Sequence, residues 1–188
     1  MKNPIKVWPN PILCKNIPMA TEITEDMDRC VVDLRLLMDE FSCYGLAANQ
    51  IGDPYRIIII RDQGDVTKVY FNPFIISRGH ETEEDVEECL SIPNFRGPVS
   101  RSTTIRFGAN RHEGDGYECD VHGHDARVIQ HEIDHLDGII FPGQMNTRQR
   151  VVSGWKRFRA SLKEAHNSAR SDKELRRPPK RRKGKRRK

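Results

Sequence analysis

Residues 130–138 read Gln130-His131-Glu132-Ile133-Asp134-His135-Leu136-Asp137-Gly138, and the other segments of the chain are best understood from there outward. Two histidines four residues apart lie on one face of a helix, one turn from each other, so both can bind a single metal ion. Glu132 follows the first of them and would be held beside that metal, where a carboxylate can move protons to and from water. The pattern therefore predicts a metal site with a neighbouring proton carrier.

The flanking residues give this stretch the signals of a helix that begins and ends nearby. Asp125 offers an N-cap, and Gly138 falls where a glycine is expected to end the helix. Ile129, Ile133 and Leu136 form one apolar stripe, while the histidines and Glu132 occupy another face. A helix used on two faces is expected to be central and buried. The alternative is an exposed helix with two solvated histidines.

Length and composition limit the class of protein. A chain of 188 residues is most simply one domain with enough length to bury a core. Residues 170–188 carry 12 Lys or Arg and 2 acids, a net of +10 against +5 for the whole chain, which leaves the body at about −5. The sequence therefore predicts a catalytic domain over residues 1–166 and a basic, disordered tail over residues 167–188.

The lengths of the apolar runs and the placement of the cysteines argue against further classes of protein. No apolar run approaches the length of a membrane span. The five cysteines are odd in number and scattered, which argues against a disulfide framework and favours a reducing, cytoplasmic setting. No Cys-x-x-Cys pair exists, so a zinc ribbon is excluded.

Residue patterns outside the central helix predict a mixture of helices and strands. Residues 1–20 contain Pro-bounded turns and are typical of an extended arm around the body. Apolar residues at helical spacing predict helices over about 24–41 and 147–166. Runs rich in β-branched and aromatic residues predict strands at residues 56–61, 68–72, 74–77, 103–107 and 117–121.

Two further polar residues draw attention because of their surroundings. Gln50 is an amide in an apolar neighbourhood, and by itself it is more simply a satisfied structural amide than a catalytic one. Cys89 is flanked by Glu88 and Leu90, and most such cysteines are buried residues that only fill space in the core. It matters here because the histidine pair needs a third ligand, and a thiolate is the softest one available.

Taken together, three motifs resemble those of the peptide deformylase family. The family pattern G-φ-G-φ-A-A-x-Q, with φ an apolar residue, matches residues 43–50 except that Cys43 replaces the first Gly. The pattern E-G-C-L-S matches residues 87–91 except that Glu88 replaces Gly, and Q-H-E-x-D-H matches residues 130–135 without departure. The resemblance covers roughly residues 1–165.

The resemblance implies a fold, an activity and a metal. The fold would be α+β, with antiparallel β-sheets packed around the central metal-binding helix and a C-terminal helix. The activity would be removal of the formyl group from the starting methionine of new polypeptides. The metal would be typically Fe(II), with Zn, Ni or Co able to occupy the same ligands. The implied metal ligands are Cys89, His131 and His135.

Roles for other residues also follow only from the resemblance. Glu132 would take the water proton and pass it to the departing amine. The amide of Gln50 and the backbone N–H of Leu90 would stabilise the oxyanion. The backbone at Tyr44, Gly45 and Glu88 would pair with an extended N-formyl-methionyl peptide, and Ile129 and Tyr44 are candidates for the methionine pocket.

Departures from the family pattern keep other functions open. Cys43 and Glu88 are tolerable only where the backbone φ is negative, and Cys43 brings a second thiol near Cys89 for a disulfide or for metal. Arg127 stands where the family is usually apolar, and its side chain is expected to snorkel to the surface. The alternatives are a His-Glu-x-x-His metallopeptidase, or a ribosome- or RNA-binding protein on an inactive deformylase scaffold.

The basic C-terminal region suggests a partner. The family's last helix contacts the ribosome in bacteria, and residues 147–166 occupy its place. The basic tail would bind ribosomal RNA through phosphates, or else remain a solvated tail that binds any polyanion weakly. A monomer is the expected oligomeric state.

Overall fold

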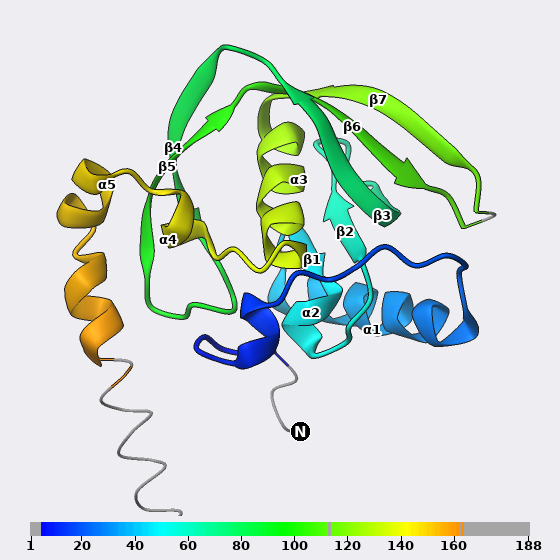
Figure 1. Cartoon of the computed structure of the whole chain (residues 1–188), viewed down its shortest axis with the longest axis horizontal. Coiled ribbons are helices and arrows are strands. Elements are labelled where there is room, and N and C mark those ends of the chain that lie inside the picture. The colour runs from blue at the N-terminus through cyan, green and yellow to red at the C-terminus, as the bar shows by residue number, and fades with distance from the viewer. Residues whose placement is uncertain (1–4, 113, 162, 164–188) are drawn as a thin grey trace, which may run out of the picture.

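The computed structural model describes residues 5–112, 114–161 and 163 (Figure 1). The helices are η1 (a 3-10 turn, Pro11–Cys14), α1 (Glu25–Phe41), α2 (Ala48–Ile51), α3 (Gly123–Leu136), α4 (Phe141–Gln144) and α5 (Thr147–Val152). The strands are β1 (Gly45–Ala47), β2 (Ile57–Arg61), β3 (Thr67–Arg78), β4 (Thr82–Glu88), β5 (Arg96–Ser102), β6 (Thr104–Asn110) and β7 (Gly116–His122). The expected α+β class with antiparallel sheets is confirmed.

Two antiparallel sheets surround α3. The larger sheet has the order β1-β2-β3-β6-β7, and β4 and β5 form a separate pair. Figure 1 shows α3 standing between the two sheets, with α1 at the lower edge of the view. The arrangement leaves β1 and β4 each with one edge that has no strand partner among the described residues.

Strand β2 explains why the larger sheet can carry helices on both faces. Its four isoleucines, at positions 57 to 60, are all buried. Ile58 and Ile60 pack in one core cluster with the apolar side of α3, and Ile57 and Ile59 pack in another with α1. An unbroken apolar run of this kind is typical of a strand buried on both faces.

The central helix begins three residues earlier than the sequence predicts. His122 is its N-cap, and Asp125 lies inside the first turn, so the predicted Asp125 cap was wrong. A carboxylate in the first turn still favours the helix because the N-terminal end of the helix dipole is positive. At the other end Asp137 is the C-cap, followed by Gly138 at φ +75°, as the glycine signal predicts.

The strand pattern differs from the prediction in two places. Residues 68–72 and 74–77 belong to one strand, because Pro73 sits at a register shift between Phe71 and Phe74, where its missing N–H costs no ladder bond. Strands β4 and β5 occupy segments in which the sequence predicts none. Charged residues, Gly and Pro dominate there, so pairing and burial of selected side chains determine the structure instead of intrinsic propensity.

The N-terminal arm joins three functional segments by backbone hydrogen bonds. The N–H of Lys6 donates to Gln50 (2.6 Å), that of Trp8 to Ser91 (2.8 Å), and that of Ile17 to Leu136 (2.7 Å). The predicted arm therefore fastens α2, the segment after β4 and the end of α3.

The C-terminal region is helical but interrupted. The single helix expected over residues 147–166 is two helical segments, 147–152 and 155–161, because Gly154 adopts φ +70°. Trp155 packs against Trp8 and Phe95 and so fixes the second segment to the body. The expected disordered tail over residues 167–188 lies outside the described residues. Within the described part of the chain, no helix is long and apolar enough to cross a membrane.

Candidate metal centre and active site

The structure brings Cys89, His131 and His135 together. Cys89 directly follows β4, and the two histidines lie one turn apart on α3. One potential ligand atom from each residue falls within 4.8 Å of the other two, and Cys89 Sγ is 3.1 Å from His135 Nε2. One thiol and two imidazoles at this spacing suit a tetrahedral metal site that keeps a position for water.

The surroundings of these three residues are suited to a metal. His131 Nδ1 is 2.9 Å from Glu87 Oε2, which directs the other ring nitrogen toward the cluster. Burial lowers the pKa of His135 well below its usual value and so keeps the imidazole neutral, as a ligand must be. The sulfur of Cys89 accepts from Gln50 Nε2 and from the backbone N–H of Ser91, each at 3.4 Å. The donor set therefore fits a resident divalent metal.

Glu87 connects the metal centre to two arginines. Arg101 donates to both carboxylate oxygens of Glu87, at 2.6 and 2.9 Å, and to Asp134 at 2.7 Å. Arg127 adds a further hydrogen bond to Glu87 at 2.9 Å. Burial would raise the pKa of Glu87, but the hydrogen bonds from His131 and Arg101 outweigh it and lower that pKa. Glu87 is therefore a buried anion that holds His131 in orientation.

Glu132 is the buried carboxylate with no fixed partner on one oxygen. Its side chain is almost fully buried, and its Oε2 atom has no hydrogen-bond partner among the described residues. Burial raises the pKa of Glu132 to about 7, against the opposing effect of His131. A carboxyl group with this pKa can both accept and release a proton near neutral pH.

Glycine at position 45 makes room for Glu132. A Cβ atom on Gly45 would lie 2.5 Å from Glu132 Oε1 and 2.8 Å from a Val128 methyl group. Any side chain there would displace the carboxylate. The glycine of the first motif is thus explained by the close approach of β1 to α3.

Gln50 lies in contact with the same centre. Its Oε1 accepts from the backbone N–H of Ala47 at 2.9 Å, and its Nε2 donates to Ser91 Oγ at 3.1 Å as well as to Cys89. These hydrogen bonds agree with the interpretation of Gln50 as a structural amide. They also place an amide donor beside the cluster of Cys89, His131 and His135. The backbone N–H of neighbouring Leu90 has no acceptor within the described part of the chain.

A cavity of about 1010 Å³ opens onto these groups. It lies between β1 and β4, the two strands with unpartnered edges. Tyr44, Gly45, Glu88 and Leu90 line it, as do Gln50 and Glu132. The structure does not bring Ile129 to the cavity. That side chain is fully buried in the core against β2, and the preceding residue, Val128, lines the cavity in its place because one step rotates the helix by about 100°.

The two replaced glycines are accommodated. Neither Cys43 nor Glu88 is among the non-glycine residues with positive φ, so neither is strained. Glu88 is exposed, lines the cavity, and lies 3.6 Å from Arg96 across the β4–β5 pair. Burial, and then Glu132, raise the pKa of Cys43 to about 12, so it is a neutral thiol, and both Cys43 and Cys89 are free of disulfides.

Several residues that support the site have no role in the sequence prediction. Asp134 and Ser91 lie in the motifs. Asp134 depends on Arg101, which lies on β5, a strand with too little strand character to be predicted, and Ser91 accepts from Gln50. Arg127 was expected at the surface, and this was wrong. Its side chain is 11% exposed, and its guanidinium donates to Glu87 and to the backbone oxygens of Val99 and Glu83.

Comparisons with known proteins agree with this geometry. The family model described as polypeptide deformylase matches residues 2–151. The peptide deformylase of Acidobacterium capsulatum is 38% identical over 146 residues, which are 75% of this chain and 85% of that protein. The solved peptide deformylase of Thermotoga maritima has a TM-score of 0.72 at 31% identity, covering 76% of this chain and 96% of that one.

A third comparison is with a solved complex. The Met-Ala-Ser-bound class I type b peptide deformylase of Acinetobacter baumannii has a TM-score of 0.70 at 25% identity, covering 75% of this chain and 96% of that one. The family model thus spans most of the chain, and the relatives are matched over most of their own length. The chain therefore belongs to the peptide deformylase family, hydrolases that remove the N-formyl group from the initiator methionine of nascent polypeptides.

Proposed function

We propose that Cys89, His131 and His135 hold one divalent metal ion and that Glu132 carries the proton in hydrolysis of the formyl amide. The observation that carries this proposal is the unpartnered buried oxygen of Glu132 beside the ligand cluster. When bound, the metal supplies a Lewis acid that makes hydroxide available from water near neutral pH. Fe(II) is the proposed metal, and Zn, Ni or Co suit the same thiolate and imidazole donors.

Glu132 performs both proton transfers. Its free oxygen accepts the proton of the attacking water, and the new bond forms between the water oxygen and the formyl carbon. Glu132 then gives that proton to the amine nitrogen as the carbon–nitrogen bond breaks, leaving formate and a free N-terminus. A pKa of about 7 suits both steps because it lies near the pH at which the group must work.

Gln50 and Leu90 are the proposed donors to the developing oxyanion. The Nε2 amide of Gln50 is fixed next to Cys89 by its bond to Ser91, so it needs little reorganisation. The N–H of Leu90 is available because no carbonyl or side chain of the described residues accepts from it. Both residues line the cavity that contains Glu132.

The peptide is proposed to enter as an extended strand between β1 and β4. Tyr44 and Gly45 lie on one side and Glu88 on the other, each at an edge that has main-chain groups to offer. The Met-Ala-Ser complex of the Acinetobacter baumannii enzyme supports a tripeptide of this kind as a ligand. Val128, with Tyr44, replaces Ile129 as the candidate for the methionine pocket because it lines the cavity.

The test is formate release from formyl-Met-Ala-Ser by protein purified anaerobically and assayed for bound metal. Glu132→Ala is expected to retain the metal and lose turnover by about 10²- to 10⁴-fold, the usual contribution of a proton carrier. Cys89→Ala is expected to lose the metal, and an intact metal content would contradict the ligand assignment. Metal without turnover in the wild-type protein would favour the inactive-scaffold alternative.

The remaining expectations stay predictions. We propose one catalytic domain over residues 1–166, a monomer, and a cytoplasmic location, for which the five free cysteines are the support. We also propose that the C-terminal helical region and basic tail contact the ribosome. Deleting residues 168–188 would weaken RNA binding at low salt, and unchanged binding would remove the tail from the proposal.

A further inference from the structure

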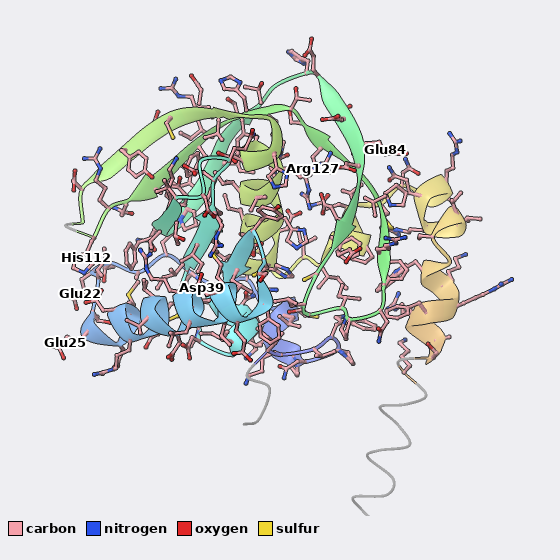
Figure 2. The ribbon with its side chains drawn as sticks, turned by 180° about the vertical axis from the view of Figure 1, so that it is seen from behind. Glu22, Glu25, Asp39, Glu84, His112 and Arg127 are labelled. Atoms are coloured by element: carbon pink, nitrogen blue, oxygen red, sulfur yellow. The ribbon has the colours of Figure 1, made fainter. Side chains whose placement is uncertain are left out.

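Arg127 forms a connection that neither the motifs nor the proposed chemistry require. It projects from α3 toward β4 and β5 (Figure 2). Its guanidinium donates to Glu87 Oε1 at 2.9 Å, to the backbone oxygen of Val99 at 3.1 Å and to that of Glu83 at 2.7 Å. Three acceptors on two strands are therefore held by one planar group with a fixed fork of donors.

These acceptors surround the middle of β4. Glu83 and Glu87 lie two residues either side of Asp85, and Asp85 is paired with Val99 of β5. Two of the three acceptors are main-chain oxygens, one on each strand, so Arg127 holds the backbone of the pair as well as the Glu87 side chain. Asp85 and Val86, which lie between Glu83 and Glu87 along β4, line the cavity.

The rest of the β4–β5 pair is attached to α3 by other groups. Arg101 joins Asp134, and Gln130 Nε2 donates to the backbone of Ser102 at 2.9 Å. Both contacts belong to β5. Among the described residues, Arg127 alone connects a side chain of α3 to the main chain of β4. A two-stranded sheet has little stability of its own, so this connection fixes the part of β4 around Glu83, whereas Glu87 is also held by His131.

Glu87 does not depend on Arg127 for its place. It keeps two hydrogen bonds from Arg101 and one with His131 when the guanidinium of Arg127 is removed. Loss of Arg127 would therefore loosen the edge of β4 and leave the orientation of the metal ligands intact.

We propose that Arg127 is a positioning residue that fixes the peptide-facing edge of β4 against α3, and so determines how tightly the enzyme binds peptide residues beyond the methionine. The inference rests on the proposed strand-like binding of the peptide. It names the part of the substrate that depends on this residue: the main chain after the first amide, which would pair along β4, and not the formyl group.

The experiment compares two substrates, formyl-Met-Ala-Ser and the shorter formyl-methionine amide, in Arg127→Met and Arg127→Lys. Arg127→Met is expected to raise KM for the tripeptide about tenfold, the equivalent of one charge-assisted hydrogen bond, and to change KM for the short substrate less than about twofold. Metal content should be unchanged. Arg127→Lys should recover part of the loss, because a lysine retains the charge without the planar fork. Arg106→Met, at an exposed position of β6, is the matched control and should change neither KM.

The outcomes separate this inference from the proposed function. Equal shifts of KM for both substrates, or loss of metal, would show a merely structural role, and no shift would remove the inference. Wild-type protein without turnover would contradict the proposed function, and the inference is then decided by amide hydrogen exchange. In Arg127→Lys, the backbone amides of residues 83–88 should exchange faster than in the wild type, and those of residues 131–135 should exchange at the wild-type rate. Unchanged exchange at residues 83–88 would overturn it.

Discussion

Replacing Gly45 by alanine is the most direct test of the position of Glu132. The added Cβ would stand 2.5 Å from Glu132 Oε1, whereas ordinary contacts begin at 3.4 Å. The carboxylate must therefore move by about 0.9 Å, the difference between these distances. The added Cβ would also stand 2.8 Å from a Val128 methyl group, so two side chains of the helix must give way to it.

The size of the effect follows from this displacement. A misplacement of about 1 Å in a group that positions the reaction costs on the order of 10²-fold in rate. We therefore expect kcat/KM for formyl-Met-Ala-Ser to fall about 100-fold, which corresponds to about 2.7 kcal/mol of transition-state stabilisation. The metal should remain, because Gly45 does not touch its ligands.

The assay measures formate release, bound metal and thermal unfolding for Gly45→Ala and for a control, Gly116→Ala. Gly116 lies at the start of β7 with its nearest neighbours 4.0 Å from the position of a Cβ, so alanine fits there and activity should be unchanged. The control separates the general effect of replacing glycine from the displacement of Glu132.

A double mutant decides whether the loss acts through Glu132. If Gly45→Ala only displaces the carboxylate, it should cost little more in a Glu132→Ala background, because the displaced group is already gone. Fully additive losses would refute the reasoning, and so would near wild-type activity in Gly45→Ala.

Three further predictions concern stability and reactivity. Arg101→Met should lower the free energy of unfolding in urea by about 3–5 kcal/mol, because it removes the guanidinium shared by the buried carboxylates of Glu87 and Asp134 and leaves Asp134 with Gln144 alone. A loss below about 1 kcal/mol would contradict the pairing. The pKa of Glu87 is lower in the folded state than its unfolded value of about 4.3. The ionised carboxylate therefore stabilises the fold fully above about pH 4.3, and this stabilisation declines as the pH falls below that value. The stability of Glu87→Gln should change less between pH 5 and 2 than that of the wild type. Iodoacetamide at pH 8 should modify the exposed Cys14 at least about tenfold faster than Cys43, because the pKa of Cys43 is raised to about 12. Equal rates of modification by mass spectrometry would contradict a neutral thiol at Cys43.

The sequence predicts the parts of this molecule in which local pattern and tertiary structure agree. Helix α3 has an apolar stripe, a terminal glycine and functional residues one turn apart, and each signal points to the same buried helix. The isoleucines of β2 form a β-branched run that predicts a strand, and the structure has a strand there, at residues 57–61. The cluster of Cys89 with the histidine pair is likewise anticipated, although its motif carries the prediction and not its spacing in the sequence.

Features that depend on pairing between distant segments could not be predicted. Strand β4 is almost wholly acidic, and only its contacts with β5 and α3 make it a strand. Ile129 and Val128 differ by one helical step, and which of them faces the cavity is fixed by the position of β2. The charged side chain of Arg127 is expected to be exposed to water. It is mostly buried because three acceptors pair with it, and those acceptors lie on strands 28 to 44 residues away in the sequence.

The unpartnered edge of β4 also affects how the protein behaves in concentrated solution. An open strand edge is a template on which another copy of the same chain can add its own strand and begin to aggregate. In β4 every residue except Glu87 is exposed, and four of these exposed side chains are carboxylates. A second copy would bring the same charges against them, at a cost that grows with each residue paired. The acidity that makes β4 hard to recognise in the sequence thus protects the protein from self-association.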